Sequence, residues 1–195
     1  SAEVGDDVFE EDPTINALEQ KSAKLFGMEA GLFCPSGTQT NQIAINVHTR
    51  PGDEVICDIL SHIHVYEGGG IAANSGVSTT LLSGENGQIT SAQIEAVIKP
   101  DNVHFPNSTL VSLENTCNKA GGTVYDLNQI KEIQNLCKTK NMALHLDGAR
   151  VFNAIEAAGY SALEIGKCFD SISICLSKGL GAPVGSVLVG TQEFI

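Results

Sequence analysis

The sequence has few basic residues and no tryptophan, and it lacks the patterns that mark several common classes of protein. It holds 11 Lys and Arg against 23 Asp and Glu, which gives a formal net charge of −12. This charge argues against nonspecific binding to nucleic acid or anionic membranes, although a helix N-terminus can still bind a small anion. No apolar run reaches the ~18 residues of a membrane span, and the first residues show no signal-peptide pattern.

The cysteines lack the spacing of a metal site or a redox motif. No two of the six form a C-x-x-C pair, and most lie in apolar runs. This pattern predicts reduced, mostly buried thiols in a cytoplasmic protein, and it argues against a zinc site; we predict no bound metal. The cysteines are Cys34, Cys57, Cys117, Cys137, Cys168 and Cys175.

Two nucleotide-binding patterns are also missing. The chain has no Gly-x-x-x-x-Gly-Lys-Ser/Thr loop, and no Gly-x-Gly-x-x-Gly run follows its first predicted strand. Nucleotide hydrolysis and dinucleotide binding are therefore disfavoured.

What the sequence does contain is typical of a globular α/β protein. Hydrophobic residues make up 42% and charged residues 17% of the 195 residues, which excludes a disordered chain. Apolar runs of strand length alternate with segments of helical periodicity, and helix-capping patterns begin at Asp12, Thr90, Asp126 and Ser161. This alternation predicts βαβ units, and hence a mostly parallel sheet flanked by helices on both faces. The predicted strands span residues 31–34, 54–58, 77–82, 110–113, 142–146, 171–176 and 187–189.

The last long strand leads to a lysine. In residues 171–176 the apolar Ile172, Ile174 and Leu176 alternate with small or polar residues, and Lys178 follows beside glycines. Lys178 is either an exposed lysine at the end of a strand or an amine that carries chemistry, most often as a Schiff base.

Ligands gather at the carboxyl ends of parallel strands, so the other strand ends give further candidates. Residues 36–39 form a helix N-terminus that is either a phosphate cradle or an ordinary cap. Asp147 is either a buried carboxylate that needs a cation or the cap of the next helix. Arg150 suits a substrate carboxylate or a salt bridge. His62 is either a structural loop residue or a ring that stacks on an aromatic ligand or moves a proton.

Taken together, these candidates fit one cofactor, pyridoxal 5'-phosphate. It needs a phosphate cradle, a carboxylate on its pyridinium nitrogen, a flat ring against its face and a lysine for its aldehyde. Gly37 with Thr38, Asp147, His62 and Lys178 would meet these needs in turn.

With these residues, the chain resembles from end to end the threonine aldolase and aromatic β-eliminating lyase family. That family has the aspartate-aminotransferase-type fold. The matching segments are 5–8, 11–14, 36–41, 62–67, 114–116, 145–150 and 176–180.

The resemblance implies a fold, a set of roles and a reaction. The implied roles are Lys178 as the Schiff-base amine, Asp147 on the pyridine nitrogen, Gly37, Thr38, the Gln39 backbone and Ser177 at the phosphate, His62 on the ring, and Arg150 on the substrate carboxylate. The implied reaction is retro-aldol cleavage of a β-hydroxy-α-amino acid, such as threonine or allo-threonine, to glycine and an aldehyde. A homo-oligomer, dimer or tetramer, is implied as well.

Two residues depart from the family's pattern. Cys117 stands where the family commonly has a histidine that can contact the substrate hydroxyl, and Phe9 stands where a tyrosine is frequent. Histidines and bound water are the family's usual candidates for the base, so the Cys117 position leaves the base and the preferred β-substituent open.

We expect residues 1–195 to be the large pyridoxal-phosphate-binding domain, truncated at both ends, with residues 1–12 as an N-terminal segment and without the small C-terminal domain. Such a piece should bind the cofactor poorly. Three other interpretations stay open: a β-eliminating lyase that releases ammonia and a keto acid, a catalytically incomplete fragment that pairs with a complete homologue, and a flavodoxin-like or Rossmann-like binding domain with an unreactive Lys178.

Overall fold

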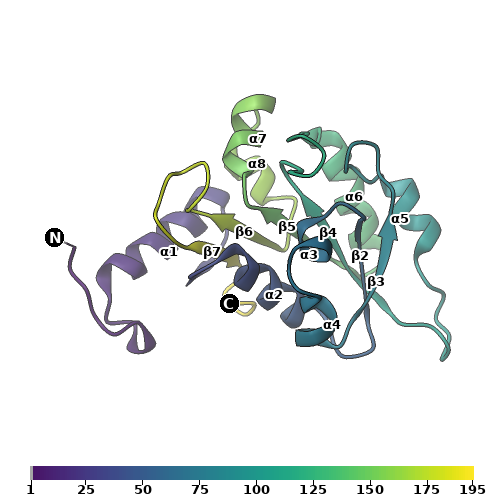
Figure 1. Cartoon of the computed structure of the whole chain (residues 1–195), viewed down its shortest axis with the longest axis horizontal. Coiled ribbons are helices and arrows are strands. Elements are labelled where there is room, and N and C mark those ends of the chain that lie inside the picture. Colours follow the sequence, from purple (N-terminus) through teal and green to yellow (C-terminus); the bar gives the residue numbers. More distant parts are fainter. Residues whose placement is uncertain (1) are drawn as a thin grey trace.

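A seven-stranded sheet with the order β1-β7-β6-β5-β4-β2-β3 runs through the centre of the molecule (Figure 1). The computed structural model describes residues 2–195. Five neighbouring strands, β6 to β3 in that order, are parallel, and β7 is antiparallel to both β6 and β1. The predicted mostly parallel sheet is therefore confirmed. The strands are β1 (Ala30–Cys34), β2 (Glu54–Asp58), β3 (Ser78–Leu82), β4 (Ser108–Glu114), β5 (Ala143–Gly148), β6 (Ser171–Cys175) and β7 (Ser186–Gly190).

The helices with local capping signals lie where the sequence predicts them. Asp12 accepts hydrogen bonds from the N–H groups of Thr14 and Ile15, and Gly27, at φ +68°, ends the first helix. Capping boxes open the helices after Thr90 and Asp126. No helix within residues 2–195 is long and apolar enough to cross a membrane. The helices are η1 (Asp7–Phe9), α1 (Pro13–Phe26), α2 (Gly37–His48), α3 (His62–Val65), α4 (Gly70–Ser75), α5 (Ser91–Val97), α6 (Leu127–Thr139), α7 (Val151–Ala158) and α8 (Ala162–Gly166).

Two short segments differ from the prediction. His62 was expected in a loop but begins α3, whose start has no side-chain cap; instead the His62 N–H donates to Glu114 Oε2 of β4 at 2.9 Å. This contact joins residues 52 apart, so no local pattern reveals it. Strand β6 ends at Cys175, and Lys178 therefore lies three residues beyond it rather than at its end.

Helices cover both faces of the sheet. The larger core joins one face to α1, α5, α6, α7 and α8, and the smaller core joins the other face to α2, α3 and α4. All six cysteines are buried and unpaired, as the sequence predicts.

The face under α2 is polar in its middle. Along β5, Leu144 and Leu146 belong to the larger core, so the alternate residues His145 and Asp147 point to the α2 side. There Thr40 of α2 and Ser173 of β6 share a hydrogen bond of 2.6 Å between hydroxyl oxygens. This polar stretch positions the candidate site.

Candidate active site

A cavity of about 310 Å³ lies at the carboxyl ends of β5 and β6, beside the start of α2. This is the end of a parallel sheet where ligands bind. Of the predicted site residues, it brings together Gly37, Thr38, His62, Asp147, Ser177 and Lys178. The other residues that line it are Pro35, Ser36, Asn41, Ala149, Cys175, Pro183 and Val184.

The first turn of α2 forms one wall. Ser36 Oγ accepts a hydrogen bond from the Gln39 N–H at 3.2 Å, and Gly37 packs so closely on β6 that a Cβ there would lie 2.6 Å from Cys175 Sγ. A helix N-terminus presents free N–H groups and the positive end of the dipole, so this wall suits an anion. Gln39 itself is exposed and does not line the cavity.

Lys178 supplies the amine of the cavity. Its side chain is exposed, Ser177 beside it also lines the cavity, and within residues 2–195 no ion pair involves it. The ammonium is therefore available to a ligand.

Asp147 supplies a buried carboxylate. It is 3% exposed; Oδ1 accepts from the Ala149 N–H at 3.1 Å and Oδ2 from Asn41 Nδ2 at 2.9 Å. Burial, and then the nearby Glu67 carboxylate, raise the pKa of Asp147 above its usual value. A cation placed against this carboxylate would relieve both effects.

His62 is held from two sides. Its Nδ1 lies 2.9 Å from Glu67 Oε1, and its backbone N–H donates to Glu114. The hydrogen bond to Glu67 raises the pKa of His62, while burial opposes the rise. These two contacts fix the half-buried ring in the cavity wall. Glu67 contacts its Nδ1, so Nε2 is the ring nitrogen that this contact does not use.

Glu67, Asn41 and Gln42 are site residues that the sequence analysis missed. Both Glu67 oxygens accept side-chain hydrogen bonds, Oε1 from Asn41 and Oε2 from Gln42 at 2.7 Å. One side-chain atom each of His62, Glu67 and Asp147 lies within 4.8 Å of the other two. Asn41 lies one turn after Gly37 on the same helix face, a signal that could have found it. Glu67 follows α3, a helix not predicted; its only signal in the sequence is that it ends the family-matching segment 62–67.

Besides Gln39, three more residues singled out in the sequence lie outside this cavity. Arg150 precedes α7 and is half-buried; it forms no ion pair within the described chain and does not line the cavity. Cys117 is buried beside Gly87, and burial raises the pKa of its thiol. Phe9 is 71% exposed in η1. Cys117 and Phe9 are therefore not part of the cavity wall in this chain.

Comparison with known proteins agrees with this geometry. A family model described as beta-eliminating lyase matches residues 1–195. The chain belongs to the beta-eliminating lyase family. It is 43% identical over 196 residues to the low specificity L-threonine aldolase of Escherichia coli K12, covering 100% of this chain and 58% of that protein. It is 45% identical over 199 residues to low-specificity L-threonine aldolase 1 of Arabidopsis thaliana, covering 100% and 56%.

Solved structures in this family share the fold. A putative L-allo-threonine aldolase from Listeria monocytogenes superposes with a TM-score of 0.84 at 28% identity, covering 100% of this chain and 51% of the other. A putative aromatic amino acid beta-eliminating lyase/threonine aldolase from Exiguobacterium gives 0.84 at 29%, covering 100% and 52%. The chain spans about half the length of the curated relatives it matches.

Proposed function

We propose that the protein to which this chain belongs is a pyridoxal-phosphate-dependent aldolase that cleaves a β-hydroxy-α-amino acid, such as threonine or allo-threonine, to glycine and an aldehyde. The single observation that carries the proposal is the shared cavity of Lys178, Asp147, His62 and the first turn of α2. The names of its relatives support the substrate class.

The residues of the cavity fit pyridoxal phosphate. The start of α2, with Gly37 and Thr38, offers N–H groups to a phosphate, and Asp147 is a buried carboxylate without a cation partner in the described chain. A cavity of about 310 Å³ lies within the size range of small-ligand sites. When bound, the cofactor supplies an electron-accepting ring for the charge that develops on the substrate.

Each residue then has a defined task. Lys178 would supply the amine that holds the cofactor, and Asp147 would sit against its ring nitrogen and keep that nitrogen protonated. Glu67 accepts a hydrogen bond from Nδ1–H of His62, so Nε2 would be the ring nitrogen free to act as a base for the substrate hydroxyl, and the ring would stack on the cofactor.

The remaining assignments concern the substrate and the edges of the site. We assign the substrate carboxylate to Arg150, and additional phosphate contacts to Ser177 and the Gln39 backbone. Residues 1–195 would form the large cofactor-binding domain, with residues 1–12 as its N-terminal segment. Val4, Val8 and Phe9 are apolar residues of the first nine that are 71–84% exposed, which supports a homo-oligomer with a neighbouring subunit over this segment. The buried free thiols support a cytoplasmic location.

The test is cofactor trapping. Purified protein mixed with pyridoxal phosphate should develop a visible absorbance band, and borohydride reduction followed by peptide mass spectrometry should place the adduct on Lys178. Lys178→Ala should abolish the band, whereas Lys167→Ala, an exposed lysine after α8, should keep it. A colourless wild-type protein of the full length of its relatives, or an adduct only on another lysine, would overturn the proposal.

The description of the family, beta-eliminating lyase, supports β-elimination as a second candidate reaction. Incubation of the holoenzyme with threonine and allo-threonine distinguishes the two: glycine plus aldehyde supports the aldolase, and ammonia plus a keto acid supports the lyase.

A further inference from the structure

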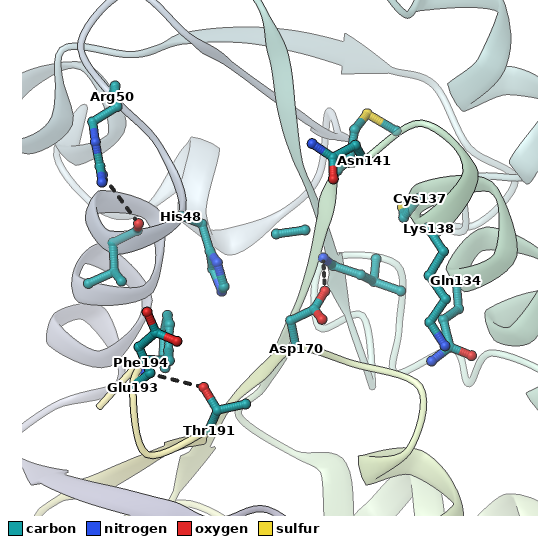
Figure 2. Close-up of a pocket in the computed structure, with 14 residues that line it drawn as sticks. His48, Arg50, Gln134, Cys137, Lys138, Asn141, Asp170, Thr191, Glu193 and Phe194 are labelled. Carbon is teal, nitrogen blue, oxygen red and sulfur yellow. Dashed lines mark hydrogen bonds between the residues drawn. The ribbon is translucent and has the colours of Figure 1, made fainter.

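A continuous chain of hydrogen bonds crosses the polar stretch under α2. It begins at His48, the last residue of α2, in a second cavity of about 720 Å³ at the opposite ends of the strands. Figure 2 shows His48 beside Phe194 there; the two rings are stacked with centroids 4.6 Å apart. These hydrogen bonds continue from His48 through Ser171 and His145 to Asn41. They end at the Glu67 and Asp147 carboxylates of the candidate active site.

The Asn41 amide can take only one orientation in this chain. Its Nδ2 lies 2.9 Å from Glu67 Oε1 and 2.9 Å from Asp147 Oδ2. Because an ionised carboxylate can only accept, the two N–H bonds of the amide must point to these two acids. Asn41 Oδ1 therefore faces His145 Nε2, 3.1 Å away.

The amide in turn determines where the histidine protons lie. An amide oxygen only accepts, so His145 Nε2 carries a hydrogen. Burial lowers the pKa of this fully buried ring to about 3, so it is neutral and its Nδ1 accepts from the Ser171 hydroxyl at 2.8 Å. The single hydroxyl hydrogen of Ser171 is then used, and His48 Nε2, 2.8 Å from Ser171 Oγ, must be a donor.

We propose that Asn41 is a positioning residue that holds Asp147 and Glu67 side by side as separate carboxylates, and that His145 fixes the orientation of its amide. Two buried like charges repel, and a donor shared between them offsets this repulsion. If the amide were turned over, its oxygen would face both acids and its N–H groups would face His145. Through Glu67 the amide also steadies His62.

The consequence for the cofactor rests on the proposed function. The helix that begins at the phosphate cradle carries Asn41 one turn later. One element would therefore position both the phosphate and, through Asp147, the ring nitrogen.

The first experiment needs no cofactor. Nitrogen-15 NMR of the histidine rings in the protein without pyridoxal phosphate should show both His145 and His48 with the proton on Nε2. The His145 ring should stay neutral from about pH 5 to pH 9. A proton on Nδ1 of His145 would overturn the inference.

The second experiment uses Asn41→Asp, which keeps the size of the side chain but replaces the double donor by an acid. The dissociation constant for pyridoxal phosphate should rise about ten- to hundredfold near pH 8. The ratio to wild type should shrink near pH 6, because a proton taken up by the cluster restores a donor. The ionisable groups around the substituted position are Glu67, Asp147, His62, His145, Glu114 and Lys178.

The control is Asn46→Asp, the same change at an exposed position of α2, which should leave the dissociation constant unchanged. The dissociation constant of Asn41→Asp divided by that of wild type could instead be the same at pH 6 and pH 8. Asn41 would then only fill space, and the proposal would be wrong. Asn41→Ser, which keeps one donor, should bind with intermediate affinity and serves if Asn41→Asp does not fold; affinity equal to wild type would overturn the proposal. If NMR shows the predicted histidine tautomers but the protein does not bind pyridoxal phosphate, only the proposed function is contradicted.

Discussion

The two ends of the parallel strands differ in how they hold their charged residues. The cavity at the carboxyl ends is the smaller, about 310 Å³ against about 720 Å³, yet Asp147 is only 3% exposed there and Glu67, bonded to its wall, only 7%. In the larger cavity, the charged residues Arg50, Asp170 and Glu193, whose positions Figure 2 shows, are exposed. Buried, hydrogen-bonded carboxylates therefore distinguish the candidate site from the other cavity, whereas cavity size does not.

We expect the largest effect on kcat from replacing one of two aspartates, Asp147 or Asp170, which lie at opposite ends of the parallel strands. Asp147→Asn removes the buried negative charge without changing the shape, and should lower kcat of the holoenzyme at least about a hundredfold. Asp170→Asn keeps an oxygen that can accept the Leu144 N–H, and should leave kcat within about twofold. Steady-state kinetics with threonine measure both; equal losses would remove the distinction between the ends.

Matched arginines should show the next largest effect. Arg150→Lys exchanges a planar two-pronged donor for a point charge and should raise KM for the amino acid about tenfold, with a smaller change in kcat. Arg50→Lys, in the larger cavity, should change neither, because among residues 2–195 the Arg50 side chain donates only to the backbone oxygens of Val47 and Thr49. An unchanged KM in Arg150→Lys would show that another cation binds the substrate carboxylate.

His145, on β5 between the two ends, makes stability depend on pH. Its pKa is about 3 in the native protein and about 6.5 in an unfolded chain. Because the unfolded chain binds the extra proton in this interval, the free energy of unfolding should fall as the pH decreases from about 6.5 to 3, by up to about 1.4 kcal/mol per pH unit.

Urea denaturation at several pH values measures this slope. His145→Gln should reduce it relative to wild type, whereas His104→Gln, at an exposed position, should keep it. An unchanged slope in His145→Gln would mean that the ring is already protonated in the native protein.

The smallest effect should come from matched glutamates. Glu67→Gln removes the carboxylate at His62 Nδ1, so the pKa of His62 should fall. Glu193→Gln in the larger cavity should not change it. Proton NMR titration of the His62 ring gives both values, and a pKa unaltered by Glu67→Gln would show that the contact does not perturb the ring.

The sequence predicts the elements whose starts and ends are determined by residues close together in the chain. The cap at Asp12 and the stop at Gly27 define α1, and the capping boxes define the starts of α5 and α6. The parallel sheet follows from the alternation of strands and helices. His62, Asp147 and Lys178 do line one cavity, because Asp147 lies at the carboxyl end of β5 and His62 and Lys178 follow strands that end at the same edge.

The sequence does not predict what depends on contacts between distant residues. The Asn41–Asp147 hydrogen bond joins residues 106 apart, and the Asn41–Glu67 hydrogen bond residues 26 apart. These contacts depend on which strands are neighbours, and a single sequence does not give the strand order. For the same reason the sequence could not show that Arg150 and Gln39 lie outside the cavity of the single chain.

The position of β7 has a consequence for how the protein is made. This strand lies between β1 and β6, so Ala30 near the start of the chain pairs with Gly190 near its end. Until β7 has left the ribosome, β1 has no partner in the sheet, and the wall of β6 and β7 on which Gly37 packs is incomplete. We therefore expect the phosphate cradle to form only after β7 has been synthesised, when β2 to β6 can already pair, and to be the step in the folding of this sheet that joins the residues furthest apart in sequence.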